Sequence, residues 1–595
     1  MHCIRGAAAG GSPFLLRETQ MLRKEHPKPQ FERDTWLNLN GKWKYAFDFG
    51  LSGEEQGWAR DTSAMKGTIN VPFCPESALS GVEYKDFIPA IWYSRTFTVP
   101  EEWQGKRIFI NFGAVDYECS VYINGALAGT HVGGAASFGF EITHLLKKRN
   151  TVTVCARDDS RGGYQPMGKQ STRYASYGCI YTRTTGIWQT VWLEARGSAY
   201  IERVRTDTDV DNSQVTFSPV FRDAERGMLF EVSVSRDGSE IFCGRYPASG
   251  SPVTVPMEDP ALWCPEAPFL YDTAFALLDA DGNVIDSVKS YFGFRKIHIE
   301  GNRFFLNNRE IFLRLVLDQG FYPQGIWTAP SDEALEGDIR MSLAAGFNGA
   351  RLHQKVFEER YLYHADRLGY LVWGEYYDWG INYDSYHSFY DHMAEWSEVV
   401  TRDVNHPSII AWTPFNETAG GAAAHRKLHD RHVADIVALT KRLDPSRPVN
   451  DTSGYVHVAT DIYTVHDYNQ DAASFAAFYA DIKPGGDYEH MPKHIPTQGY
   501  KGQPFVIDEY GGTWWEHDPG KKENWGYGER CKTIEEVYAR IDALTKAIFD
   551  NPAIAGFCYT QLTDVELEKN GIYTYDRKQK FDMDRIKAIF DRKTR

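Results

Sequence analysis

Two glutamates, Glu417 and Glu509, each follow a strongly apolar run with the character of a buried strand. A charge at such a place is costly unless it is paired or used, although a solvated strand end is the ordinary explanation for a single glutamate. Two carboxyl groups in one pocket can divide their work, because a protonated one supplies a proton while an ionised one acts as a nucleophile. The pair, 92 positions apart (509 − 417), is the strongest chemical signal in the sequence.

This division of labour is what cleavage of a glycosidic bond with retention requires. The two carboxyl groups of such an enzyme lie about 5–5.5 Å apart, on either side of the bond that breaks. The group that acts as the acid must hold its proton at working pH, so its pKa is expected to be raised. The chain must therefore fold so that positions 417 and 509 face each other across one pocket.

The elements that could position them lie after residue 300, where strand-like and helix-like segments alternate. One helix is expected to begin at Ser331 and to end at Gly346, and another carries Val433, Ile436 and Val437 on one face. Eight strand–helix units in about 290 residues predict a (β/α)8 TIM barrel over 298–595, whose active site lies at the C-terminal ends of its strands. The eight apolar runs are IFLRLVLDQ, FNGARLH, YLVWGEY, IIAWTPFNE, RPVNDTS, DIYTVHDY, PFVIDEYGG and IAGFCYTQ.

The first half of the chain has a different character. Apolar and polar residues alternate on both sides of Asn124-Gly125, which is a hairpin signal, and no long helical pattern interrupts the strands. We expect a β-sandwich over 1–197 and a second, immunoglobulin-like β-sandwich over 198–297.

Composition narrows the classes of function. The 595 residues carry a formal net charge of −15, which argues against nucleic acid or an anionic membrane as partner, and no apolar run approaches the roughly 18 residues of a membrane span. Nine cysteines without metal-type spacing indicate free thiols in a reducing compartment. The N-terminus lacks a secretory pattern, so we expect a cytoplasmic protein, with secretion left open if a signal was removed.

Two motifs resemble those of glycoside hydrolase family 2, the β-galactosidase and β-glucuronidase family. RDVNHPSIIAWTPFNE (402–417) looks like the acid/base motif, and QPFVIDEYGG (503–512) is similar to the nucleophile motif. The resemblance extends over nearly the whole chain, through FERDTWLNLNGKWKYAFDF, VDYECSVYINGALAGTHVGG, LWCPEAPFLY and FGFRKIHIEGNRFFLNNREIFLRLV. It implies an N-terminal jelly-roll sandwich that resembles sugar-binding domains, an immunoglobulin-like sandwich and a catalytic barrel.

The resemblance also implies roles for single residues. Glu417 resembles the acid/base and Glu509 the nucleophile, so we expect a raised pKa for Glu417. Asn416 resembles the amide that bonds the sugar 2-hydroxyl. Arg351 and Tyr468 would hold Glu509 ionised, the first through a charge-assisted bond and the second through its hydroxyl.

Other strand-end residues depart from the family pattern. His353 follows Arg351 one residue earlier than usual, and either it or His466 could position neighbours or touch sugar. Asp318 stands where relatives often carry His-Glu, and we include it among the substrate-binding candidates. Because the magnesium-binding Glu-x-His pair is missing after Glu375, we predict no catalytic metal and no cofactor.

The identity of the sugar stays open between two choices. Relatives that cleave glucuronides carry Asn-x-Lys before a stretch like GIYTYDRK, but here Glu568 and Asn570 occupy those places. A glutamate there would repel a uronate, so a β-galactoside is the first choice. A β-galacturonide or β-glucuronide is the alternative, because Lys569, Arg577 and Lys578 could form a rearranged carboxylate site.

Four further residues are candidates for the walls of the pocket. Strand eight lacks the tryptophan usual in relatives, and Tyr559 or Gln561 is expected to replace it. Trp514 and Trp515 follow the nucleophile and could line the aglycone side or simply pack their loop.

We therefore expect a retaining exo-β-glycosidase whose partner is a carbohydrate or glycoside. An inactive sugar-binding protein and a transglycosylase are the alternatives, and homo-oligomerisation is left open.

Overall fold

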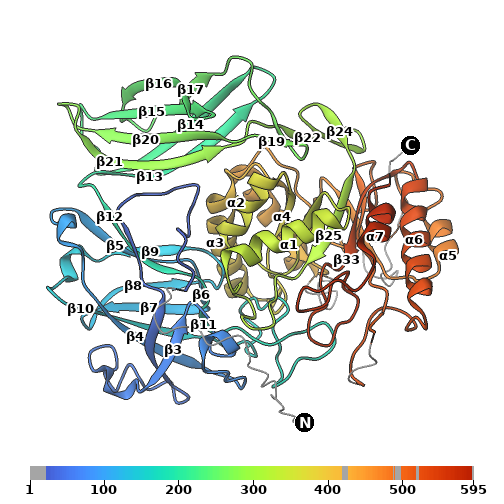
Figure 1. Cartoon of the computed structure of the whole chain (residues 1–595), viewed down its shortest axis with the longest axis horizontal. Coiled ribbons are helices and arrows are strands. Elements are labelled where there is room, and N and C mark those ends of the chain that lie inside the picture. The colour runs from blue at the N-terminus through green and yellow to red at the C-terminus, as the bar shows by residue number, and fades with distance from the viewer. Residues whose placement is uncertain (1–21, 419–425, 487, 489–496, 518–521, 593–595) are drawn as a thin grey trace, which may run out of the picture.

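The computed structural model describes residues 22–418, 426–486, 488, 497–517 and 522–592, so the expectation drawn from the N-terminal residues lies outside the described part of the chain. Figure 1 shows two β-sandwiches on one side of a barrel of strands and helices. The three parts follow one another along the chain in the order that the sequence predicts.

The first sandwich is built from a six-stranded sheet, β3-β2-β4-β10-β7-β8, and a four-stranded sheet, β1-β12-β5-β9, with the short pair β11-β6 beside them. Alternate residues of both sheets meet in one apolar core that includes Trp43, Ile91 and Leu193. The strands are β1 (Trp36–Asn38), β2 (Gly41–Phe47), β3 (Gly67–Val71), β4 (Ala90–Phe97), β5 (Arg107–Phe112), β6 (Val115–Asp116), β7 (Glu118–Ile123), β8 (Ala126–Val132), β9 (Phe138–Glu141), β10 (Asn150–Arg157), β11 (Gly186–Ile187) and β12 (Val191–Arg196). Short 3₁₀ turns lie at Thr62–Ala64, Ala78–Ser80, Glu101–Trp103 and Thr143–Leu145.

The predicted Asn124-Gly125 turn joins β7 to β8. Both residues have positive φ, 53° and 83°, as a two-residue turn of the type that suits twisted hairpins requires.

The second sandwich packs the sheet β13-β14-β17 against β16-β15-β20-β21. Its core includes Phe217, Phe230 and Phe275. Its strands are β13 (Tyr200–Asp209), β14 (Gln214–Arg222), β15 (Leu229–Arg236), β16 (Ser239–Pro247), β17 (Val253–Pro256), β18 (Trp263–Cys264), β19 (Ala267–Pro268), β20 (Tyr271–Leu278) and β21 (Val284–Phe292).

The third part is the barrel. Seven parallel strands form a curled sheet in the order β28-β27-β26-β25-β33-β32-β31, and the parallel pair β29-β30 lies between its two ends. Before it, β22 (Ile297–Glu300), β23 (Arg303–Leu306) and β24 (Arg309–Ile311) make a small antiparallel sheet. The barrel strands are β25 (Leu313–Asp318), β26 (Gly349–Leu352), β27 (Leu371–Glu375), β28 (Ile409–Thr413), β29 (Phe415–Asn416), β30 (Thr452–Ser453), β31 (Tyr463–Asp467), β32 (Phe505–Gly511) and β33 (Ile554–Thr560).

Helices surround the barrel, and the two that the sequence predicts are confirmed. Ser331 caps the first helix by accepting a hydrogen bond from the Ala334 amide, and Leu335 and Ile339 lie on its buried face. The other described helix buries Val433, Ile436 and Val437. The described helices are α1 (Asp332–Ala344), α2 (Glu359–Leu368), α3 (Tyr386–Asp403), α4 (Arg426–Leu443), α5 (Ala472–Phe478), α6 (Ile534–Asp550) and α7 (Met583–Phe590).

The fifth strand–helix unit is shorter than predicted. Only Thr452 and Ser453 of the run RPVNDTS form a strand, and residues 454–462, all described, reach β31 without a helix. The polar residue before the strand explains the early end of regular structure, because Asp451 accepts hydrogen bonds from the amides of Val458 and Ala459 and folds the chain back on itself.

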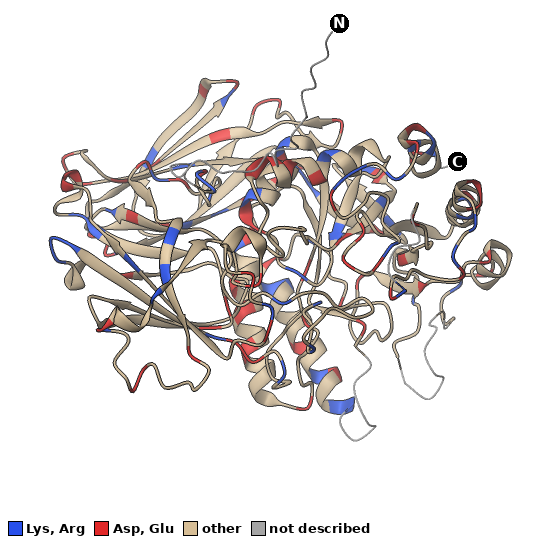
Figure 2. Ribbon diagram, turned by 60° about the horizontal axis from the view of Figure 1, so that its bottom comes forward, with Lys and Arg blue, Asp and Glu red and all other residues tan. Residues whose placement is uncertain are grey.

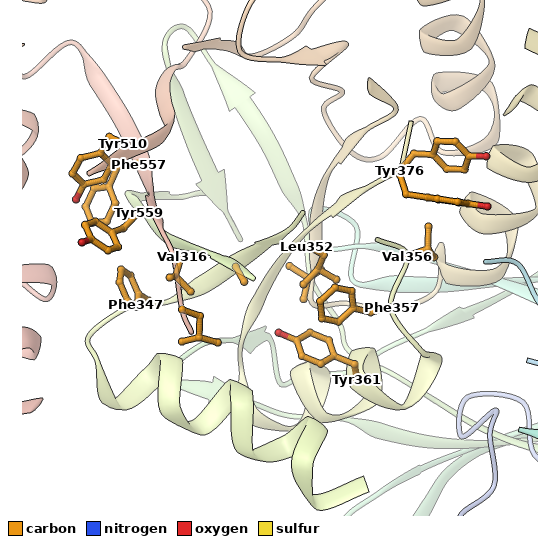
Figure 3. Packing of buried hydrophobic residues seen from close by; sticks show 14 of the residues in the cluster. Val316, Phe347, Leu352, Val356, Phe357, Tyr361, Tyr376, Tyr510, Phe557 and Tyr559 are labelled. Atoms are coloured by element: carbon orange, nitrogen blue, oxygen red, sulfur yellow. The ribbon is translucent and has the colours of Figure 1, made fainter. Parts of the chain in front are cut away.

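Alternation along the strands separates two layers of packing. In β25, Leu315 and Leu317 point into the barrel, where β22 and β23 close its floor, whereas Val316 points outward to the helices. Figure 3 shows part of the outer layer, with Val316, Tyr361, Phe557 and Tyr559 among its members.

Three further features bear on the sequence expectations. No described helix is long and apolar enough to cross a membrane. The eight cysteines within the described ranges are free thiols. Lys and Arg are interspersed with Asp and Glu along all three parts in Figure 2.

Candidate active site

The two glutamates singled out by the sequence lie close together at the mouth of the barrel, and we call their surroundings the pocket. Glu417 directly follows β29, and Glu509 lies in β32. One carboxylate oxygen of each, together with a ring nitrogen of His466, all lie within 4.8 Å of one another. This spacing fits the roughly 5–5.5 Å of a retaining pair and is too short for the 6.5–9.5 Å that inversion needs.

Arg351, near the end of β26, orients Glu509. Its guanidinium is fully buried and donates to a Glu509 oxygen through one terminal nitrogen. The other terminal nitrogen donates to Glu375 at 2.6 Å and to the Asn416 side-chain oxygen at 3.2 Å. Because the guanidinium is planar, these partners fix the orientation of the Glu509 carboxylate.

Tyr468 donates its hydroxyl to the second oxygen of Glu509. Burial raises the pKa of Tyr468 well above its ordinary value, so the hydroxyl keeps its proton and remains a donor. Its ring stacks on Tyr527, with centroids 3.4 Å apart and planes 2° apart. Tyr527 was not predicted from the sequence.

His466, in β31, lies between the two glutamates. Its Nδ1 is 2.7 Å from Glu417 and 3.5 Å from Glu509, and its Nε2 is 2.9 Å from the Ser453 hydroxyl. Burial alone lowers the pKa of His466, but the charges of Glu509 and Asp508 and the bond to Glu417 raise it to about 9. The ring is therefore an imidazolium at neutral pH.

The expected raised pKa of Glu417 is wrong. Burial does raise it, but the hydrogen bond and charge of His466 outweigh burial and, with the charge of Lys169, hold the pKa below its ordinary value. Tyr455, another residue that the sequence did not reveal, also bonds Glu417. Because the pKa of His466 is raised and that of Glu417 is lowered, a proton shared by the two side chains favours His466.

The backbone at Glu417 is strained. Its φ is +51°, in the left-handed region that residues other than glycine rarely adopt. Its amide donates to the Ser453 carbonyl at 2.8 Å, which ties this conformation to β30. Strain of this kind is concentrated at functional positions.

Asn416 offers an unused donor. Its side-chain oxygen accepts from Arg351, whereas its Nδ2 is buried and bonds no other described residue. Its carbonyl accepts from the indole of Trp379 at 3.2 Å. A buried amide without an acceptor is costly, so this nitrogen fits a ligand hydroxyl.

His353 lies at the rim but faces protein. Its Nδ1 is 3.0 Å from Glu375 and 3.9 Å from Glu509. Burial lowers the pKa of His353 well below its ordinary value, so the ring is neutral, and burial raises the pKa of Glu375 to about 8. His353 therefore serves to orient Glu375, which in turn holds Arg351.

Three side-chain amides form a hydrogen-bonded chain that ends at the carboxylate of Glu568. Gln561 donates to the Asn570 oxygen at 2.7 Å, and Asn570 donates to Glu568 at 2.9 Å. At the other end of the chain, Gln319 donates to the Gln561 oxygen at 2.9 Å. Tyr181 donates to the second oxygen of Glu568. The structure thus brings these three predicted residues together and adds two that were missed, one from the first sandwich.

Two predicted residues lie elsewhere. Asp318 accepts from the Gly320 amide at 2.9 Å and from the α2 hydroxyl of Tyr361 at 3.3 Å, so it faces the helices. Tyr559 packs on Phe590 and Tyr510 in the outer layer (Figure 3). Both occupy outward positions of their strands, because neighbouring residues of a strand point to opposite sides.

The two tryptophans after the nucleophile pack their loop. Trp514 lies against Gly526, where an added Cβ would come within 2.6 Å of it, and Trp515 packs on the outer apolar layer. Neither makes a described contact with Glu417 or Glu509.

Lys169 reaches the pocket from the first sandwich and was also missed. Its ammonium lies 4.3 Å from the centroid of the Trp379 ring, and the side chain is buried. Burial lowers its pKa, but Cys179 and the carboxylates of Glu568, Glu509 and Glu417 more than compensate and raise it. It stands in the irregular segment 158–185, which carries no periodicity from which its place could be predicted.

Comparisons with known proteins agree with this geometry. Three models of glycosyl hydrolases family 2 match the chain in order: the sugar binding domain at 37–166, the family 2 domain at 199–295 and the TIM barrel domain at 297–593. A β-glucuronidase of Paenibacillus borealis is 24% identical over 93% of this chain and 96% of its own length. A β-galactosidase of Thermoanaerobacter pseudethanolicus is 23% identical over 65% of this chain and 51% of its own length. The solved structure of a Ruminococcus gnavus β-glucuronidase with an N1-substituted uronic isofagomine matches with a TM-score of 0.78 and 20% identity, covering 96% of this chain and 100% of that chain.

Two sandwiches joined to a barrel with paired carboxylates at its mouth define a glycoside hydrolase that acts on O-glycosyl bonds with retention. Its substrate is accordingly a carbohydrate. Since family models match almost all of the described chain, it belongs to glycoside hydrolase family 2.

Proposed function

We infer that this protein is an exo-acting β-uronidase that releases a terminal β-linked glucuronic or galacturonic acid, with Glu509 as nucleophile and Glu417 as acid/base. The observation that carries the assignment of roles is the pair of carboxylate oxygens within 4.8 Å, of which only those of Glu509 are held by both Arg351 and Tyr468. An ionised, oriented carboxylate is what attack on the anomeric carbon needs.

In the first step, Glu509 attacks the anomeric carbon and the bond to the aglycone oxygen breaks. That oxygen takes a proton from Glu417, which has received it from His466 Nδ1 across their 2.7 Å contact. In the second step, Glu417 removes a proton from water, the water oxygen displaces Glu509, and the proton returns to His466. The sugar leaves with its original configuration.

Asn416 is placed to strengthen the transition state. Its unpaired Nδ2 can donate to the hydroxyl next to the anomeric carbon, a contact that tightens as positive charge develops on the sugar ring. Arg351 holds the amide by its oxygen, so the nitrogen is left to face the pocket.

The sequence favours a β-galactoside because Glu568 would repel a uronate, but the comparisons support the alternative better, since the relative matching over 93% of the chain is named a β-glucuronidase. The contacts of Glu568 weaken the argument that it would repel a uronate. Both oxygens of Glu568 accept hydrogen bonds, from Tyr181 and Asn570, and burial raises its pKa. Its charge is not presented to the sugar without partners.

The test is a panel of nitrophenyl β-glycosides comprising glucuronide, galacturonide, galactoside, glucoside and mannoside, combined with NMR of the first-formed product. We expect the highest kcat/KM on a uronide and a β-configured first product. A panel led by the galactoside would contradict the sugar assignment, and an α-configured first product would contradict the roles of the two glutamates.

A further inference from the structure

The segment 158–185 of the first sandwich is fastened to the barrel beside the glutamates. The Met167 amide donates to the Trp379 carbonyl at 2.6 Å, and the Gly168 amide donates to the Tyr377 carbonyl at 3.1 Å. Gly168 has a φ of +58°, and a Cβ there would lie 2.4 Å from the Gln354 carbonyl oxygen. Only glycine fits this crossing, so the residue after it is held in one place.

That residue is Lys169. Its side chain is 6% exposed, and its ammonium makes no hydrogen bond or ion pair with any residue in the described ranges. The Trp379 ring beneath it supplies a cation–π contact, and the Trp379 indole bonds the backbone carbonyl of Asn416. The carboxylates of Glu568, Glu509 and Glu417 stabilise its charge without bonding it directly, so its N–H groups remain able to donate to the anionic group of a bound ligand.

The other positively charged side chains considered for the sugar carboxylate are either paired with a carboxylate or lie in another cavity. Arg577 donates to Asp338 of α1 and to the Phe321 carbonyl, and Lys578 is paired with Asp576 at the surface. Lys569 lines a separate cavity of about 620 Å³ with Glu566 and Lys85. The three positively charged residues that the sequence offered for a rearranged carboxylate site are therefore not available to a sugar held between the glutamates.

We propose that Lys169 is the specificity-determining residue of this site and that its ammonium pairs with the sugar carboxylate of the uronide. The inference rests on the proposed function and adds a location: the sugar's acid group points away from the barrel wall, toward the first sandwich. Tyr181 comes from the same segment, where its amide bonds the Lys169 carbonyl, so the first sandwich supplies two side chains to the pocket.

Removing the ammonium would leave a uronate facing three carboxyl groups, Glu568, Glu509 and Glu417, with no nearby cation free to bind it. A neutral sugar meets no such repulsion and loses no ion pair. The ratio of activities on a uronide and on the matching neutral sugar therefore reports on Lys169 alone, whatever the absolute rates are.

The experiment compares wild type with Lys169→Met and Lys169→Arg on nitrophenyl β-glucuronide and β-glucoside, and on the galacturonide and galactoside pair. We expect Lys169→Met to lower kcat/KM for the uronides about 100-fold, mainly through KM, and to change the neutral sugars less than about 5-fold. Lys169→Arg should recover part of the loss because it keeps the charge. Lys578→Met, which removes an exposed cation from the barrel, is the matched control and should leave the ratio unchanged.

A second variant covers the case in which Lys169→Met is poorly folded, as judged by its Tm. Gly168→Ala retains the lysine but must displace it, and we expect the same shift of the ratio to a smaller extent. Wild-type activity confined to neutral sugars would overturn the proposed function itself. Wild-type uronidase activity that keeps its uronide-to-neutral ratio in both variants would overturn only the role of Lys169.

Discussion

His466 Nδ1 lies 2.7 Å from Glu417, and the raised pKa of His466 makes this imidazole the source of the proton in the proposed acid step. As the pH rises through the raised pKa of His466, about 9, this proton is lost, so the basic limb of kcat/KM should fall near pH 9. In His466→Gln the imidazolium is gone and the proton must come from Glu417 itself, on which burial acts against the Lys169 charge and the Tyr455 bond, so the limb should move to lower pH. The measurement is the pH profile of kcat/KM. A basic limb that stays near pH 9 in the variant would refute the role of His466 as the source of the proton.

Glu509→Gln should abolish turnover, by at least about 10⁴-fold, because an amide cannot form the glycosyl–enzyme bond. The amide oxygen can still accept from Arg351, and its NH2 group can donate to the Tyr468 hydroxyl, so we expect the Tm to change little. Steady-state assays with scanning calorimetry check this, with the exposed Glu300→Gln as control. Full activity in Glu509→Gln would exclude it as the nucleophile.

Glu417→Ala removes the proton donor but spares the nucleophile. Substrates with good leaving groups need little protonation, so kcat on dinitrophenyl glycosides should fall far less than on alkyl glycosides. Azide, which needs no base, should restore part of the activity and yield a β-glycosyl azide. Equal loss on all substrates, with no azide product, would count against the acid role.

Asn416→Ala should cost about 100-fold in kcat/KM on ordinary substrates, because its free Nδ2 would no longer meet the 2-hydroxyl. On 2-deoxy glycosides, which lack that hydroxyl, the same variant should lose much less. Kinetics with both substrate types form a double-mutant cycle in which one change is in the substrate. Independent, additive losses would show that the amide acts elsewhere.

Tyr468, directly after β31, and Tyr559, on β33, provide a matched pair on the two sides of β32. The first faces Glu509 and the second faces the outer layer. Tyr468→Phe removes a donor from Glu509 and should lower kcat about 10- to 100-fold. Tyr559→Phe should leave kcat/KM within about 2-fold of wild type and affect only the Tm. A larger kinetic effect at 559 than at 468 would contradict the placement of the two side chains.

The sequence predicted the three-part fold and the two glutamates because apolar strands that end in a carboxylate, and the motifs around them, are local signals. It misplaced Asp318 and Tyr559 for a simple geometrical reason. Neighbouring side chains of a strand point to opposite faces. Leu315 and Leu317 point into the barrel, so Asp318, the next residue, points outward to the helices.

The remaining errors concern residues that only tertiary structure brings to the pocket. Lys169 and Tyr181 precede Glu417 by more than 200 positions and lie in a segment without regular structure, so nothing local marks them. The pKa of Glu417 was misjudged for the same reason, since the shift comes from His466, whose protonation depends on Asp508 and Glu509 of β32 and on Glu417 after β29.

The crossing at Gly168 has an evolutionary consequence. If Lys169 binds the sugar's acid group as proposed, bond breaking depends on side chains of the barrel, whereas recognition of that group depends on a segment that connects two strands of the first sandwich and packs through Tyr181 on the barrel. Substitutions in that segment would then retune substrate choice while the reacting groups stay untouched.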